Sequence, residues 1–411
     1  MSEESGPAGQ RGSSLTRRIS LPLLILYGLG NIIGAGIYVL IGKVAEVAGY
    51  LAPAAFLTAA LVATLTAFTY GELASRYPYS AGEAVYLQAG FGKTWLSVTA
   101  GLLIAVAGVV SSAAIVRGFA AYLEALIEVD HTIAITLALV TMGAVAIWGI
   151  LESLLFAALF TILEIGGLVF IIWIGRGSFS VLPEHLPTMT PTLDPGAWGM
   201  ILIGGFLAFY AYIGFEDMVN IAEEVKNPRR NLPIGIVTAF VLASLLYLAV
   251  CVVGVLAVPP HELGRSDSPL ALIYHEVTGQ RPTVIGILGL LATINGALIQ
   301  IIMVSRVLYG MSRKRWLPQF FADVNERTHT PIKSTLIVAL VVWLLALFVP
   351  LVTLASATSF AILIVFTLLN LALLAIKRRD PKPAGVAVIP VWIPALGFIV
   401  SGALFVSRLV I

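Results

Sequence analysis

Charged residues are scarce in this chain. Only 11% of its 411 residues are Asp, Glu, Lys or Arg, whereas 59% are hydrophobic, and its mean hydropathy is +0.98. Because soluble domains carry about 25% charged residues, such a chain cannot cover itself with a surface compatible with water. The composition excludes a soluble globular protein and indicates one that lies in a lipid bilayer.

Several chemical groups are also rare or absent. Cys251 is the only cysteine, so no intramolecular disulfide can form. The sequence has no nucleotide-binding loop of the form GxxxxGKS or GxxxxGKT, which disfavours ATP-driven transport by this chain alone. The five histidines form no cluster with cysteine, so we expect no metal, haem or other cofactor, and we expect no nucleic acid partner. No polar stretch is long enough for a soluble domain, so binding must take place among the helices.

Long apolar runs fill most of the chain. A helix needs roughly 17–25 residues to span a bilayer, and eleven runs have about this length. They lie near 21–43, 52–75, 95–123, 132–150, 153–175, 197–222, 232–257, 283–311, 334–349, 353–376 and 386–409. Only the letters FVP at 348–350 separate the ninth run from the tenth. The pattern predicts an all-α polytopic membrane protein with about eleven transmembrane helices.

The distribution of lysine and arginine predicts the orientation. Most of them fall in the tail and loops that lie inside if the N-terminus is cytoplasmic, including the run SRKRW at 312–316. Cytoplasmic loops carry such an excess, so we expect residues 1–20 to be a cytoplasmic tail and the C-terminus to lie outside. The first apolar run is too long for a signal peptide, and we expect an integral protein of the cell membrane.

Glycines interrupt two of the apolar runs. The stretch GLGNIIGAGIY, residues 28–38, has four glycines where an unbroken helix would avoid them, since each weakens a helix relative to alanine. The sixth run, GGFLAFYAYIGFEDMVNIAEE at 204–224, has Gly214 followed by two acids. Interrupted runs at matching places in two halves indicate an inverted-repeat transporter. We therefore predict a first repeat over 21–176, a second over 196–377 and an extra helix over 386–411.

A broken helix in a membrane exposes backbone groups that can bind a ligand. The free amides at residues 34–36 would receive a carboxylate, because a helix N-terminus carries partial positive charge. Carbonyls freed at the two breaks would accept hydrogen bonds from an ammonium group. The alternative is that these glycines only let helices pack closely, as is common in membrane proteins.

Four separated regions of the sequence resemble the amino acid–polyamine–organocation (APC) superfamily of transporters, in the order found in that family. They are GNIIGAGIYVL, YGELASRYPYSAGEAVYLQAGFG at 70–92, FYAYIGFEDMVNIAEEVKNPRRNLP at 209–233 and SRVLYGMSRKRWLPQFFADVNERTHTP at 305–331. The resemblance implies the leucine-transporter fold with its 5+5 inverted repeat, alternating access, and secondary transport of amino acids or related amines.

The resemblance also implies a substrate site. The residues that correspond to the family's carboxylate site are Ala35, Gly36 and Ile37, next to Gly34 of the interrupted stretch, and those of its amine site are Ile32, Phe209, Tyr210 and Ile213. The aromatic residue that caps the substrate in many members falls at Tyr210, with Phe209 or Tyr212 as alternatives. Asn295 and the segment 353–359 are candidate polar groups of the pocket.

Acidic residues at membrane depth are candidates for ion coupling. Many family members have a lysine at the position of Glu164, so the resemblance implies a coupling role there, although the lysine-based mechanism cannot be carried over. A buried carboxyl group can load and release a proton or help to hold a cation, whereas a hydrogen-bonded structural acid is the alternative. Glu216 is a second coupling or gating candidate, whereas Asp217 is expected to face elsewhere because adjacent helical residues diverge. Glu72 and Arg76, one turn apart, are expected to be an ordinary helix pair.

The first hypothesis is a secondary active amino acid transporter, coupled to protons rather than sodium, with neutral or broad L-amino acid specificity. The alternative is a carrier or exchanger of cationic amino acids or polyamines that uses Glu216 or Glu164 as counter-charge. A channel would need a continuous polar stripe or charged ring, a sensor would need a signalling segment, and an enzyme would need a nucleophile motif or histidine cluster. The sequence shows none of these features.

Overall fold

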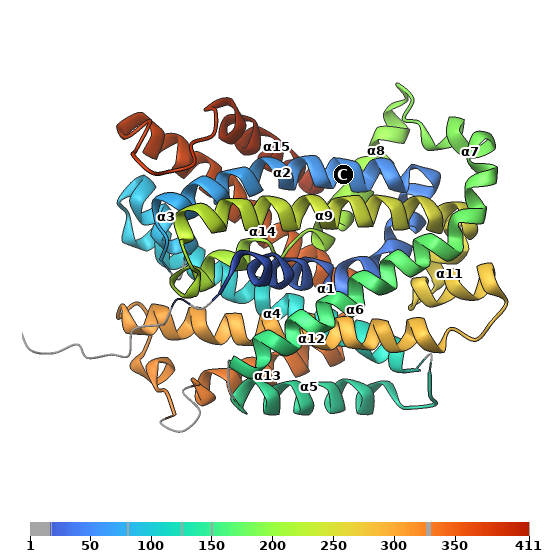
Figure 1. Cartoon of the computed structure of the whole chain (residues 1–411), viewed down its shortest axis with the longest axis horizontal. Coiled ribbons are helices and arrows are strands. Elements are labelled where there is room, and N and C mark those ends of the chain that lie inside the picture. The colour runs from blue at the N-terminus through green and yellow to red at the C-terminus, as the bar shows by residue number, and fades with distance from the viewer. Residues whose placement is uncertain are drawn as a thin grey trace, which may run out of the picture.

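Eleven long apolar helices make up most of the computed structural model, which describes residues 17, 19–79, 82–124, 126–148, 151–325 and 330–410. They are α1 (Leu21–Ala48), α2 (Ala52–Arg76), α4 (Thr94–Glu124), α5 (His131–Trp148), α6 (Leu151–Ile174), α8 (Pro195–Ala211), α9 (Pro228–Ala257), α12 (Thr283–Arg313), α13 (Ile332–Phe348), α14 (Leu351–Arg379) and α15 (Trp392–Val410). Figure 1 shows these helices lying side by side along the length of the molecule.

Short helices connect the long ones. They are the α-helices α3 (Gly82–Phe91), α7 (Leu182–Met189), α10 (Pro260–Arg265) and α11 (Pro269–Thr278), and the 3₁₀ helices η1 (Gly49–Leu51), η2 (Gly175–Val181), η3 (Glu216–Glu224) and η4 (Gln319–Ala322). Proline stands in the first turn of several helices, where its missing N–H costs nothing. Pro350, just before α14, separates α13 from α14 after Phe348.

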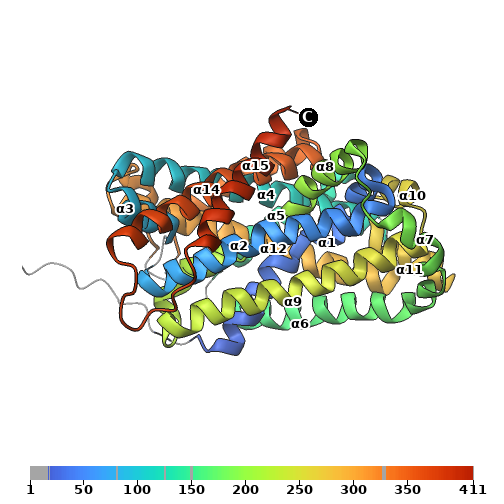
Figure 2. The ribbon, with the colours of Figure 1, turned by 90° about the horizontal axis from the view of Figure 1, so that it is seen from above.

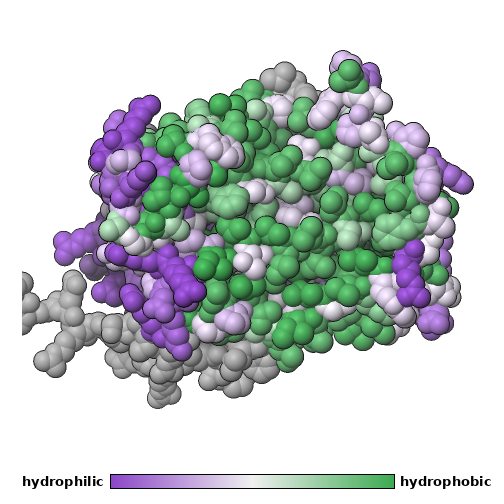
Figure 3. Space-filling view, turned by 45° about the horizontal axis from the view of Figure 1, so that its top comes forward, coloured by the Kyte–Doolittle hydropathy of each residue, from purple (hydrophilic) through white to green (hydrophobic). Residues whose placement is uncertain are grey.

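The outer surface fits a bilayer. Figure 3 shows a hydrophobic belt between two polar ends. Seven helical stretches are long and apolar enough to cross a membrane, one of them containing both α1 and α2, and three shorter apolar helices accompany them. The prediction of an all-helical integral membrane protein is therefore confirmed.

Basic side chains collect at one end of the helices. Helices α2, α12 and α14 finish there with Arg76, Arg313 and Lys377–Arg379, and we call this the basic end. It lies at the left of Figure 1, where α3 also packs.

Helix α1 runs through the middle of the molecule. It packs against α6, α8, α9 and α12 (Figures 1 and 2). Its residues Ile32, Ile33 and Ile37 are at most 1% exposed, whereas Ile162 of α6 and Leu340 of α13 are more than half exposed, on a surface that faces lipid. Any opening in α1 is therefore shielded from lipid by protein.

Candidate functional site

The first break lies in the middle of α1. Gly34 has non-helical torsion angles (φ 1°, ψ −131°), and the helix continues on both sides of it. Gly36 faces α8 so closely that a Cβ atom there would overlap the Cα of Ala211. The close-packing role that was the alternative explanation for these glycines therefore applies to Gly36, and Gly34 is the residue that interrupts the helix.

The second break separates α8 from η3. Helix α8 ends at Ala211, and Gly214 adopts φ 129°, a conformation that L-residues rarely adopt. A Cβ on Gly214 would lie 2.7 Å from the backbone oxygen of Asn31, so the second break touches α1 just before the first. Glu216 folds back over this break, where its Oε2 accepts a hydrogen bond from the Gly214 N–H at 2.8 Å. The two interruptions therefore form one site.

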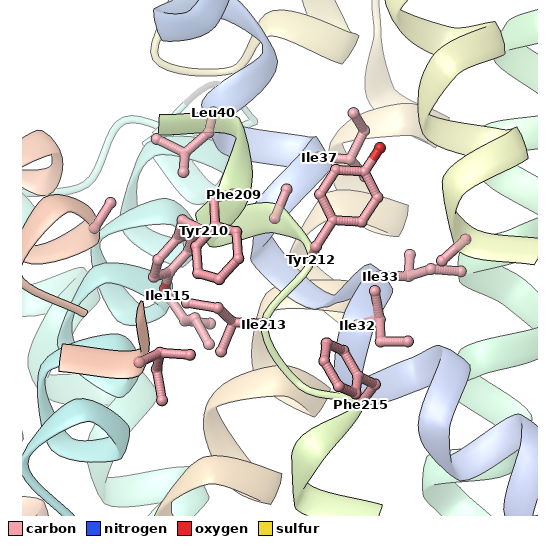
Figure 4. Packing of buried hydrophobic residues seen from close by; sticks show 14 of the residues in the cluster. Ile32, Ile33, Ile37, Leu40, Ile115, Phe209, Tyr210, Tyr212, Ile213 and Phe215 are labelled. Atoms are coloured by element: carbon pink, nitrogen blue, oxygen red, sulfur yellow. The ribbon is translucent and has the colours of Figure 1, made fainter. Parts of the chain in front are cut away.

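The three candidate aromatic residues point in different directions (Figure 4). Tyr210 reaches α4, where its hydroxyl lies 3.0 Å from the hydroxyl of Ser111 and donates to the Ser111 carbonyl at 3.2 Å. Phe209 packs against Phe366 of α14, with ring centroids 5.7 Å apart. Tyr212 lies on the opposite side and packs against Tyr247 of α9. Tyr210 is thus the aromatic that bridges α8 and α4.

Most of the backbone carbonyls expected to bind an amine already have one partner. The Ile32 carbonyl accepts the Tyr247 hydroxyl at 2.6 Å. The carbonyls of Phe209 and Tyr210 accept the backbone N–H groups of Tyr212 and Ile213 at 3.0 and 3.2 Å. Because a carbonyl oxygen has two lone pairs, the carbonyls of Ile32 and Phe209 can each accept a further hydrogen bond, whereas the Tyr210 carbonyl is also an acceptor for the Tyr212 N–H.

Glu164 and Asn295, which the sequence assigned to different roles, lie together. Asn295 donates from Nδ2 to Oε1 of Glu164 at 3.0 Å, and Glu164 is completely buried. Its Oε2 has no hydrogen-bond partner among the described atoms. At Gly30 of α1, a Cβ atom would overlap Oγ1 of Thr161, one turn before Glu164 in α6. Helices α1, α6 and α12 therefore converge at this carboxyl group.

Asp217 does not face away from the site, so the expectation for it was wrong. Its Oδ2 accepts hydrogen bonds from Nδ2 of Asn31 and Nε2 of Gln300, both at 2.9 Å. The side chain of Glu216 turns back onto the break while that of Asp217 extends toward α12, and both carboxylates line one cavity. Sequence reasoning missed Asn31 and Gln300, although each is an amide within an apolar run, where polar groups are costly and often functional.

This cavity lies between the break and the basic end. Its volume is about 10 Å³, which is room for one water molecule. Its polar lining consists of Ser111, Glu216, Asp217, Gln300 and Thr358. A larger cleft of about 780 Å³ lies at the basic end and is lined by Arg17, Arg229 and Arg230 among others. The large cleft is separate from the breaks.

No group of three or more His, Cys, Asp or Glu side chains suited to a metal ion was found in the part of the chain that the structure describes. The contacts described above are hydrogen bonds made by backbone groups, amides and carboxyl groups, next to aromatic rings.

The fold and site define an all-helical membrane protein whose central helix and a partner helix are both broken at a shared buried site. Residues 19–410 match the amino acid permease family, and the chain belongs to this family, within the APC superfamily.

Named relatives show how diverse the family is. The chain is 33% identical over 400 residues to cationic amino acid transporter 3, mitochondrial, of Arabidopsis thaliana, covering 89% of this chain and 63% of the relative. It is 28% identical to both the methylthioribose transporter and the branched-chain amino acid permease BcaP of Bacillus subtilis, covering 97% and 92% of this chain and 89% and 86% of those proteins. It spans only 63%, 62% and 64% of the length of three Arabidopsis relatives.

A solved structure supports the fold. A Na+-coupled sialic acid symporter in a substrate-bound, outward-open state matches with a TM-score of 0.64 at 13% identity, covering 96% of this chain and 90% of that one. At this identity the match concerns the fold alone, and it agrees with the predicted leucine-transporter-like architecture.

Proposed function

We propose that the protein is a secondary active transporter of amino acids that works by alternating access. The observation that carries this proposal is the meeting of the breaks at Gly34 and Gly214 in the buried middle of the molecule. Interrupted helices with their free backbone groups at membrane depth are tolerated only where protein, water or a ligand satisfies those groups. We further propose that the protein lies in the cell membrane with its N-terminus, and therefore the basic end, in the cytoplasm.

The substrate would be a neutral amino acid, or one of a broad range of L-amino acids. Its carboxylate would bind the backbone amides at the start of the second half of α1. Its ammonium group would donate hydrogen bonds to the remaining lone pairs of the Ile32 and Phe209 carbonyls. Ile115, Phe209 and Ile213 offer apolar contacts on the side of Tyr210 (Figure 4). The relative named as a branched-chain amino acid permease is consistent with an apolar side chain.

A second candidate, transport of cationic amino acids or polyamines, is favoured by one observation. Glu216 and Asp217 both line the cavity beside the break, and neither has a basic ion-pair partner within the described residues. A lysine or arginine side chain could supply the missing positive charge. Relatives named as cationic amino acid transporters agree with this candidate.

Uptake by proteoliposomes tests the function and separates the two candidates. Purified protein would be offered labelled alanine, leucine, arginine and putrescine, with protein-free liposomes as the control. Saturable uptake of alanine or leucine is the expected result. Saturable arginine exchange without neutral uptake would replace the first candidate by the second, and the absence of any saturable uptake would contradict both.

We propose that Glu164 carries the coupled proton. Its carboxyl group is buried against a single amide donor, and an ionised carboxylate there would be costly. Glu164→Gln keeps the shape and the contact with Asn295 but cannot lose a proton. The variant should bind substrate yet lose both the pH dependence of uptake and substrate-driven proton movement. A variant with unchanged pH dependence and unchanged proton movement would show that this coupling role is wrong.

A further inference from the structure

We infer that Asp217 is a positioning residue that keeps the route from the helix breaks to the basic end closed, by holding α1 and η3 against α12. This inference rests on the proposed transport function, because a route to that end is needed only if a solute passes along it. Nothing in the family match or in the names of the relatives assigns a role to this residue.

A single oxygen atom makes the connection. Oδ2 of Asp217 accepts Nδ2 of Asn31 from α1 and Nε2 of Gln300 from α12, each at 2.9 Å. Nδ2 of Asn31 also donates to the Gly214 carbonyl at 2.7 Å. All three side chains are at most 6% exposed, so water does not compete for these bonds. Three segments far apart in the sequence are thus tied at one point next to both breaks.

The orientation of Asn31 is fixed by its partners. Its Nδ2 faces two acceptors, whereas its Oδ1 is buried without a partner among the described atoms. Turning the amide over would place Oδ1 against the Gly214 carbonyl and the Asp217 carboxylate, which are both acceptors. These two contacts therefore fix the orientation of the amide. They do so although Oδ1 of Asn31 is left without a hydrogen bond, which is costly for a buried group.

The closed route runs along α4 beside this connection. The cavity next to Asp217 and Gln300 is lined also by Ile104 of α4. Ile104 lines a second cavity nearer the basic end, together with Glu83 and Lys314. Each cavity has a volume of about 10 Å³, so an amino acid cannot pass from one to the other. Movement of η3 and α1 away from α12 would widen the first cavity on the side of Asp217, and it would break the bond between Asp217 and Gln300.

A second contact lies further along the same two elements. Arg306 of α12 is 3.7 Å from Glu224 at the end of η3. This ion pair is partly exposed and longer than a charge-assisted hydrogen bond, so we expect it to contribute little. The buried connection at Asp217 is the stronger of the two.

The test measures how often the route opens. In a Cys251→Ala protein, Ile104→Cys places a thiol between the two cavities, and a membrane-impermeant thiol reagent is added to each face of the membrane in turn. Asp217→Val and Gln300→Met each remove the connection at similar volume. We expect each to raise the labelling rate from the basic end about tenfold, the usual effect of losing a hydrogen bond to a charged group, without raising it from the opposite end.

Two comparisons make the result specific. Ser305→Ala is the matched control, because the hydroxyl of Ser305 donates to the Ile302 carbonyl within α12 itself, and the change should leave labelling unchanged. The double variant Asp217→Val with Gln300→Met should label no faster than Asp217→Val alone, since the bond that Gln300→Met removes is already absent there. Asp217→Asn keeps an oxygen acceptor, so its labelling rate should lie between those of the wild type and Asp217→Val. It replaces Asp217→Val in the test if the valine variant does not fold.

Unchanged labelling in folded Gln300→Met or Asp217→Val protein would overturn the inference, and so would fully additive effects in the double variant. The assay needs no transport. Wild-type protein that transports no amino acid, combined with faster labelling of the variants, would therefore refute the proposed function while leaving the role of Asp217 intact.

Discussion

At the scale of single residues, the glycines in α1 have different tasks. Gly34 adopts the non-helical conformation that breaks the helix, whereas Gly36 has no room for a side chain because Ala211 lies against it. Both residues are glycines in the same short stretch, so the sequence alone does not show which one breaks the helix. Only the packing of α8 on α1 distinguishes the break at Gly34 from the close contact at Gly36.

Gly36→Ala tests the close contact. The added methyl group must displace the backbone of α1 or α8, so we expect a destabilisation of about 1–3 kcal/mol, typical of overpacking, and a loss of transport. The measurement is the thermal midpoint of the purified variant. Gly166→Ala in α6 is the control, since nothing lies within 4 Å of its Cβ position. Equal midpoints for the two variants would contradict the contact.

Glu83 lies outside the membrane-spanning segments, in α3, and should make stability depend on pH. Burial raises the pKa of this carboxyl to about 8, and the nearby Asp217 adds to the effect. Tyr70 faces it as well, with its hydroxyl 3.3 Å from Oε1. Because the folded state then holds a proton that the unfolded state has released, stability falls as the pH rises from about 4.5 to about 8.

The expected result is a thermal midpoint that decreases between pH 5 and pH 8 in the wild type and decreases less in Glu83→Gln. Glutamine stays neutral over this range and can still accept from Tyr70. A midpoint that depends on pH equally in both proteins would exclude Glu83 as the cause.

At the scale of helices, one buried carboxylate ties α2 to α14 and to the segment before α15. Oε1 of Glu72 accepts Nε and Nη2 of Arg76 at 2.8 and 2.7 Å. Oε2 lies 2.7 Å from Nζ of Lys377 and accepts the backbone N–H of Ile389 at 2.8 Å. The sequence suggested an ordinary pair within one helix, and the contribution of Lys377, which comes from a distant part of the chain, could not be seen there.

Glu72→Gln would leave the buried Lys377 without its counter-charge and would leave Arg76 with only the more distant Asp380, at 3.6 Å. Breaking a buried ion pair from one side costs about 3–5 kcal/mol, so we expect a large drop in the thermal midpoint. Asp323→Asn removes an exposed partner of Lys333 and should cost less than about 1 kcal/mol. Similar midpoints for the two variants would show that the cluster at Glu72 does not secure the basic end.

At the scale of the whole molecule, the polar ends and the hydrophobic belt define how the protein lies in a membrane (Figure 3). The charge distribution predicts which end faces the cytoplasm, because the basic end collects the arginines and lysines of α2, α12 and α14.

Labelling from the two sides tests this orientation. In Cys251→Ala protein, Lys382→Cys at the basic end should react with an impermeant thiol reagent only from the cytoplasmic side. Leu193→Cys, at a position 98% exposed before α8, should react only from outside. The reverse pattern in intact cells would overturn the proposed topology.

The sequence by itself determined the membrane environment, the approximate helix positions and the two places where helices break. Each of these follows from local composition: lipid selects long apolar runs, and glycine weakens the helix in which it stands. The tertiary structure decided which side chains meet. Asp217 joins Asn31 and Gln300, and Glu164 joins Asn295, across separations of 83–186 residues. Burial forces such polar groups to find partners, but which partner each finds depends on how distant helices pack, and no local pattern records that.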